Sequence, residues 1–123
     1  MSGKELDCYS DELLGFAIAC LFSGAVSKEE FRLWCVDMFS QGDIPDFFIE
    51  LAQFDGEIFQ IYKTIGHVPC WEHTESEEYA IYGIAVKRGS APSDMPVTPE
   101  AALQALEECS SVAWLFRRVF GGL

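Results

Sequence analysis

The chain has few basic residues. Its 123 residues include 8 Lys and Arg against 20 Asp and Glu, which gives a formal net charge of −12 at pH 7. No Lys or Arg occurs between Arg32 and Lys63, although several acids and aromatic residues do. Because contacts with nucleic-acid phosphates depend on Lys and Arg, this composition excludes direct nucleic-acid binding as the expected function.

Long apolar runs are also missing. A membrane-spanning helix needs roughly 20 apolar residues, and the longest candidate run, 13–26, is shorter and is interrupted by Gly15, Ser23 and Gly24. Residues 1–5 (MSGKE) do not give the basic start and apolar segment of a secretory signal. We therefore expect no membrane partner and a cytoplasmic location.

Recognisable catalytic motifs are lacking as well. The sequence has no Gly-rich phosphate loop, no G-x-S-x-G turn and no H-E-x-x-H helix. Carboxylates are so abundant that pairs for acid–base chemistry carry no information without geometry. We expect no enzyme activity and no cofactor.

One spacing resembles a metal site, namely His67, Cys70 and His73. A structural zinc site needs about four ligands, so one of the following acids would have to complete it. A nucleophilic pair of Cys70 with either histidine is formally possible, but a thiolate needs electropositive surroundings, and this segment runs into acids. The favoured interpretation is a buried Cys70, two histidines on a loop, and no metal.

The cysteines do not indicate disulfides. They are five in number, scattered, and mostly embedded in apolar helical patterns. We expect free, buried, reduced thiols. The residues are Cys8, Cys20, Cys35, Cys70 and Cys109.

What the chain does have is apolar residues at helical spacing. Half of its residues are apolar and 14% are aromatic, which is enough for a substantial core in one domain over 1–123. We predict an all-α fold, a single compact domain of about six helices. The expected ranges are about 11–23, 27–42, 43–55, 57–65, 74–89 and 98–120.

Capping residues mark several of the helix starts. Two starts carry capping boxes, in which a Ser or Thr and the Glu three residues later bond to each other's backbone. The boxes are Ser27 with Glu30 and Thr74 with Glu77, while Ser10 and Thr98 are simpler caps.

Two helix predictions depend on patterns that allow more than one structure. Residues 79–86 (YAIYGIAV) suit a strand by composition, and the cap at Thr74 favours a helix. In 98–120, apolar residues recur in steps of four and three and predict one long final helix. Trp34 and Trp114 lie in such helical stripes, so we expect both in the core.

Acids gather in two places. Asp43, Asp46 and Glu50 are spaced so that they would share one face of the predicted third helix. The ordinary interpretation is a solvated helix face. The bases that normally accompany acids on such a face are missing here, which favours a binding surface for a cationic partner.

The second place follows the His67–His73 segment. Four acids occur within seven residues between two aromatic residues that would act as apolar anchors at an interface. Acids are also common at helix N-termini, where the helix dipole stabilises them. The predicted contact residues are Trp71, Glu72, Glu75, Glu77, Glu78 and Tyr79.

The stretch 27–34 (SKEEFRLW), followed by 44–51 (IPDFFIEL), resembles a pattern of small helical immunity proteins. These proteins belong to bacterial polymorphic-toxin and contact-dependent growth inhibition systems. The resemblance implies a cytoplasmic inhibitor, monomeric or weakly dimeric, that binds the C-terminal domain of one cognate toxin, often a nuclease, and blocks its active site. A nuclease must present Lys and Arg to phosphates, so an acidic inhibitor would compete for that basic surface.

A dedicated helical adaptor or secretion chaperone is the alternative, since such proteins are also small, acidic and specific for one partner. Secretion chaperones usually dimerise through α/β folds. An all-helical monomer would count against them.

Overall fold

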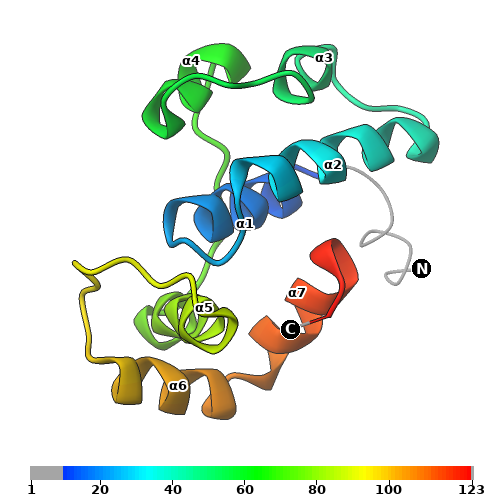
Figure 1. Cartoon of the computed structure of the whole chain (residues 1–123). Helices are drawn as coiled ribbons and strands as arrows, with labels where there is room; N and C mark the ends of the chain where they lie inside the picture. The colour runs from blue at the N-terminus through cyan, green and yellow to red at the C-terminus, as the bar shows by residue number, and fades with distance from the viewer. Residues whose placement is uncertain (1–9, 123) are drawn as a thin grey trace.

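Helix α1 (Asp11–Phe22) is the centre of the fold in the computed structural model, which describes residues 10–122 (Figure 1). Nearly every residue of α1 from Leu13 to Leu21 is buried. A helix that is apolar on all sides must be covered on all sides. The other helices provide this cover from two directions.

The remaining elements follow α1 in chain order. They are α2 (Lys28–Met38), η2 (Phe39–Gln41), α3 (Phe48–Leu51), η3 (Ile58–Gln60), α4 (Ile61–Ile65), α5 (Glu75–Arg88), α6 (Pro99–Glu108) and α7 (Ser110–Phe120). Helices α2, α3 and α4 lie on one side of α1, and α5 and α6 lie on the other (Figure 1). The prediction of an all-α, single compact domain is confirmed for residues 10–122, which contain no strand.

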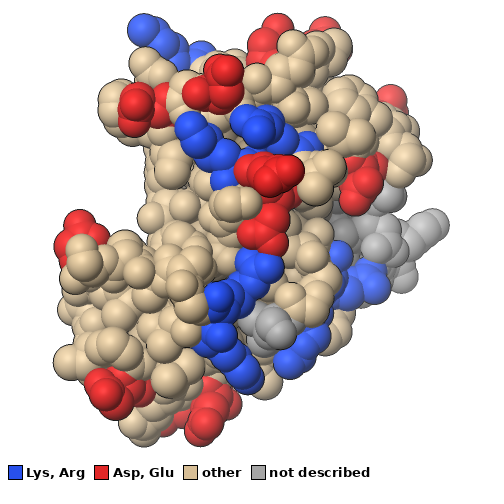
Figure 2. All heavy atoms as spheres, in the orientation of Figure 1, with Lys and Arg blue, Asp and Glu red and all other residues tan. Residues whose placement is uncertain are grey.

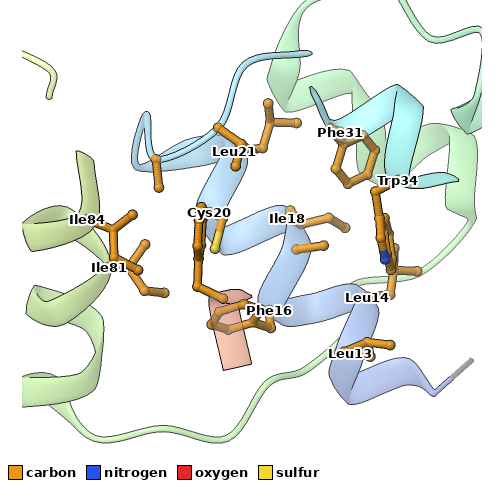
Figure 3. Close-up of a cluster of buried hydrophobic side chains, with 14 of the residues drawn as sticks. Leu13, Leu14, Phe16, Ile18, Cys20, Leu21, Phe31, Trp34, Ile81 and Ile84 are labelled. Atoms are coloured by element: carbon orange, nitrogen blue, oxygen red, sulfur yellow. The ribbon is translucent and has the colours of Figure 1, made fainter. Parts of the chain in front are cut away.

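The core is continuous through α1. Figure 3 shows Phe31 and Trp34 of α2 on one side of α1, and Ile81 and Ile84 of α5 on the other. Phe16 of α1 is fully buried among them. Because both halves of the molecule bury their apolar side chains on the same helix, they form one hydrophobic core.

The predicted caps are present. Ser27 and Thr74 each accept a hydrogen bond from the backbone of the Glu three residues later, and both capping boxes are complete. Ser10 and Thr98 cap α1 and α6 in the simpler way. Residues 79–86 lie within α5, so the helical interpretation of that stretch is confirmed.

The predicted third helix was wrong in its extent. Helix α3 begins at Phe48, and 43–47 lie before it. Pro45 disfavours helical backbone at Ile44, which lies outside the helix, and Asp46 and Phe47 form a turn before α3. Consequently Asp43 and Asp46 do not share a helix face with Glu50, contrary to the prediction.

The predicted long final helix was also wrong. Cys109, at φ −111° and ψ 70°, leaves helical geometry and separates α6 from α7. The break lets α6 pack along α5 while α7 turns toward α2, where the rings of Phe120 and Trp34 approach to 6.2 Å. The predicted core position of Trp34 is confirmed at 6% exposure, but Trp114 is 50% exposed.

Three bases tie elements together through backbone carbonyls. The Arg88 guanidinium of α5 donates to the carbonyl of Ala25 at 2.5 Å and also pairs with Glu30 of α2. Lys28 and Arg32 of α2 donate to the chain that follows α3, at the carbonyls of Gly56 and Phe54. Figure 2 shows Lys and Arg gathered down the middle of one face, where α2 meets α5 and α7. No helix within 10–122 is long and apolar enough to cross a membrane.

Gly83 sets the distance between α5 and α6, and alanine there should weaken the fold. An added methyl group would lie 2.3 Å from the Ala102 carbonyl oxygen and 2.9 Å from Cβ of Leu106. Alanine favours a helix over glycine by about 1 kcal/mol, but the clash with backbone requires α6 to move. We expect Gly83→Ala to lower the free energy of unfolding by roughly 1–3 kcal/mol, measured by urea denaturation.

Gly122→Ala is the matched control, since an added methyl group there meets nothing within 4 Å. Its free energy of unfolding should equal that of the wild type. A Gly83→Ala protein as stable as the wild type would contradict the close packing of α5 and α6.

The pair between Glu30 and Arg88 should make stability depend on pH. The Arg88 hydrogen bond is the main cause that lowers the pKa of Glu30. A carboxyl whose pKa is lower in the folded state stabilises the protein above its unfolded pKa, and this contribution is lost as pH falls through the folded pKa. Glu30→Gln keeps a residue that completes a capping box. We expect this variant to be less stable than the wild type at pH 7, with the difference shrinking below about pH 4.

Urea denaturation at several pH values measures that difference. Glu29→Gln, which changes the charge of the exposed neighbour, is the control and should follow the wild type throughout. A Glu30→Gln deficit that stays constant down to about pH 3 would show that the Arg88 pair does not contribute.

Candidate functional site

The segment from Gly66 to Thr74 joins α4 to α5 and lies directly on α1. Gly66 ends α4 in the left-handed conformation, and Thr74 caps α5. Between them, the Asp11 carboxylate of α1 contacts His67 Nε2 at 2.7 Å and accepts from the Cys70 backbone N–H at 3.4 Å. The first turn of α1 therefore holds this segment in place.

Gly15 allows the segment to approach so closely. A methyl group at this position would lie 2.8 Å from the Trp71 nitrogen and 2.9 Å from the Cys70 carbonyl carbon. The sequence indicated only that Gly15 interrupts an apolar run. In the structure it is where the backbone of the segment rests on α1.

Trp71 is the central residue of the segment. Its half-buried indole packs against the Phe16 ring, with centroids 4.9 Å apart and nearly perpendicular planes. His73 stacks on it with centroids 4.1 Å apart and planes inclined by 14°. These two contacts hold the indole where it lines two separate pockets.

The first pocket has a volume of about 300 Å³ and lies where α1, the 66–74 segment, α5 and α7 converge. We call it the indole groove, because the indoles of Trp71 and Trp114 both line it. Leu13, Val112 and Leu115 supply aliphatic surface. Its remaining lining residues are Ser10, Glu12, Glu72, Glu77 and Ser111.

The carboxylates of the indole groove differ in the hydrogen bonds that they make. Glu77 is occupied by the capping box, where its Oε1 accepts from the Thr74 backbone N–H at 2.8 Å. Glu12 and Glu72 are exposed and have no hydrogen bond or ion pair with any described residue. No Lys or Arg is among the described residues that line the groove. The groove thus presents two uncompensated charges beside two indoles.

One base lies close by. The guanidinium of Arg118 is 5.7 Å from the centroid of the Trp114 ring, one helical turn along α7. This contact orients the exposed indole, since a guanidinium over a ring face is attracted to it.

The structure brings some of the predicted contact residues together. Trp71, Glu72 and Glu77 line the indole groove, and Glu78 lines the second pocket with Trp71. Glu78 also lies 3.5 Å from His73 Nε2. Acidic and aromatic residues therefore lie together in this region, in two pockets that share Trp71. That this surface binds a partner stays a prediction.

Other predicted residues are placed differently. Tyr79 is half-buried and packs against the core, and its hydrogen bond with Glu75 raises its pKa. Neither residue is among those that line the two pockets. Asp43, Asp46 and Glu50 are exposed around the start of α3, and none of them lines either pocket.

Sequence reasoning missed Glu12 and Trp114. Glu12 is not among the predicted contact residues, and Trp114 was assigned to the core. No local signal distinguishes them, because both enter the groove through the packing of helices remote in sequence. The turn of α7 after Cys109 is what brings Trp114 beside the 66–74 segment.

The metal-like spacing does not form a metal site among residues 10–122, which contain no cluster of three or more His, Cys, Asp or Glu suited to an ion. His67 is engaged by Asp11, and His73 by Trp71 and Glu78. Cys70 is exposed rather than buried, so that part of the interpretation was wrong.

Burial disfavours the thiolate form of the other described thiols. Cys20 and Cys35 are free and buried, as predicted, and burial raises the pKa of each well above its ordinary value. Cys109 is free and half-buried, and burial also raises its pKa. Cys8 lies outside the described residues.

Gly15→Ala tests the placement of the 66–74 segment. The clash is between the new methyl group and backbone, so the segment must move away from α1. We expect a loss of roughly 1–3 kcal/mol in the free energy of unfolding, and a shifted indole N–H resonance for Trp71. The buried Trp34 resonance is the internal reference and should be unchanged. An unperturbed Trp71 resonance would contradict the contact.

Comparisons with protein-family models, with curated proteins and with solved structures find no match to this chain. No function is therefore transferred from another protein.

Proposed function

We propose that this protein is an immunity protein that binds the basic C-terminal domain of a cognate toxin and blocks its active site by stoichiometric occlusion. The observation that carries the proposal is the indole groove. Glu12 and Glu72, two exposed carboxylates with no hydrogen bond or ion pair to any described residue, lie there beside the indoles of Trp71 and Trp114. Aromatic anchors next to unpaired charges are what a protein interface with a cationic partner requires.

The distribution of charge supports the same proposal. Three of the few bases donate hydrogen bonds to backbone carbonyls of the same chain. They are therefore held away from acids in other parts of the surface and do not neutralise their charge. An excess of unpaired acids contributes nothing to compactness, because like charges repel. It does accelerate association with a basic partner, and rapid capture is what a cell needs against its own toxin.

A nuclease is the toxin class that fits best. Its active-site surface must carry Lys and Arg to bind phosphates. Carboxylates of the inhibitor occupy those bases in place of the nucleic acid, which explains inhibition without turnover or a cofactor. The resemblance of 27–34 and 44–51 to small helical immunity proteins points to the same class.

Titration against a cognate toxin domain, to be sought among the genes adjacent to this one, tests the proposal. Toxin activity should fall linearly to zero at one inhibitor per toxin. Binding should weaken steeply when NaCl is raised from about 50 to about 500 mM, because salt screens exposed charges. Tight binding that leaves the toxin active would favour the adaptor instead. Failure to bind, or binding indifferent to salt, would contradict the proposal.

Charge reversal locates the interface. The double variant Glu12→Lys, Glu72→Lys should bind the toxin about tenfold to hundredfold more weakly, mainly through slower association. Glu29→Lys, Glu100→Lys is the matched control, since both acids are exposed in first turns of other helices. The control changes net charge equally and should retain most of the affinity. Equal losses in the two double variants would remove the indole groove from the interface.

A further inference from the structure

A second pocket shares Trp71 with the indole groove. It has a volume of about 340 Å³ and is formed by α1, α4, α5 and the 66–74 segment. We call it the aromatic box, because four of the residues that line it are aromatic rings from four different parts of the chain. These residues are Phe22, Tyr62, Trp71 and Tyr82.

The rings are held by contacts with one another and with the core. Phe22 and Tyr62 meet at 5.5 Å in an edge-to-face arrangement. Trp71 is fixed by Phe16 on the core side. Phe22 is 41% exposed, so its ring is accessible from solvent. Aromatic rings present negative faces, and a box of them attracts organic cations.

The charges around the box have one sign. Glu78 is its acidic lining residue, and no Lys or Arg is among the described residues that line it. Burial, followed by the charges of Glu78 and Asp94, raises the pKa of Tyr82, so both carboxylates act on this wall. His73 and Tyr62 are the remaining titratable groups among the described residues that line the box. A cation entering the box would therefore meet ring faces and negative charge together.

His73 shows how a planar nitrogen group is accommodated here. Its imidazole stacks on Trp71 and also lies 3.5 Å from Glu78. A guanidinium group is likewise planar, carries several N–H donors, and stacks on aromatic rings better than an ammonium group does. Because His73 already covers one face of Trp71 and lies near one oxygen of Glu78, an entering guanidinium would use the second oxygen of Glu78 and the rings of Phe22, Tyr62 and Tyr82.

We infer that the aromatic box receives the guanidinium group of an arginine side chain from the basic partner. The arginine would stack within the rings and pair with Glu78. The source of the arginine rests on the proposed function, whereas the chemistry of the box does not. The box would add specificity for arginine to the more general attraction of the indole groove for positive charge.

Three capped tripeptides test this without any toxin: Gly-Arg-Gly, Gly-Lys-Gly and Gly-citrulline-Gly, each acetylated and amidated. Citrulline keeps the shape of arginine and lacks its charge. Titration into ¹⁵N-labelled protein is followed at the indole N–H of Trp71, with Trp34 as the buried reference. We expect saturable shifts with the arginine peptide, at a Kd about tenfold lower than for either of the other two.

Matched variants assign the binding to the box. Glu78→Gln and Tyr82→Leu should each raise the Kd of the arginine peptide about threefold to tenfold. Glu75→Gln and Tyr79→Leu are the controls, because these residues lie on the same helix and neither is among those that line the box. Both controls should bind as the wild type does. Glu78 is exposed, so its variant should fold normally even if Tyr82→Leu does not.

Three results would overturn the inference. One is equal binding of the arginine and citrulline peptides. Another is unchanged affinity in Glu78→Gln, and the third is a shift confined to Trp114, which would place the peptide in the indole groove. A lysine peptide that binds as tightly as the arginine peptide would refute the selectivity for arginine. The peptide titrations contain no toxin, so none of these results tests the proposed function. The titration of the toxin tests that function separately.

Discussion

The burial of α1 on all sides is the constraint on which the rest of the structure depends. It provides apolar surface to α2 in one direction and to α5 in the other, so neither half can complete its core alone (Figure 3). Its polar first turn has a second role, because Asp11 holds the 66–74 segment and Glu12 lines the indole groove. Gly15 completes the arrangement by letting the backbone of that segment lie against the helix. One helix therefore determines both the core and the geometry of the candidate site.

The scarcity of bases shapes the surface. Arg88 joins α5 to α2, and Lys28 and Arg32 fasten the chain after α3, each through backbone carbonyls. Such bonds satisfy buried or half-buried acceptors and fix loops that have little regular structure of their own. Among the described residues, Glu12 and Glu72 have no hydrogen bond or ion pair. The acidic excess comes from the composition, and three of the few positive charges are used to join elements of the fold.

Trp71 connects the two pockets, and its position determines what each can bind. Phe16 and His73 restrict the indole, so a partner meets a pre-formed surface and little conformational entropy is lost on binding. The indole groove offers two exposed carboxylates and aliphatic surface, while the aromatic box offers a site lined by four aromatic side chains and Glu78. A single partner that presents a basic surface with one projecting arginine would use both.

The sequence by itself determined the features that depend on neighbours within one helical turn. Caps at Ser27 and Thr74, the helical class and the acidic excess all follow from local hydrogen bonding and composition, and local signals survive any tertiary arrangement. Tertiary structure alone decided the break at Cys109 and the exposure of Trp114. A helical stripe specifies that apolar residues will be buried but not against which partner, so one stripe could be divided between α6 and α7. The sequence indicated the part of the site at Trp71, Glu72 and Glu77. It could not indicate Glu12 and Trp114, since only the packing around α1 brings their helices to the groove.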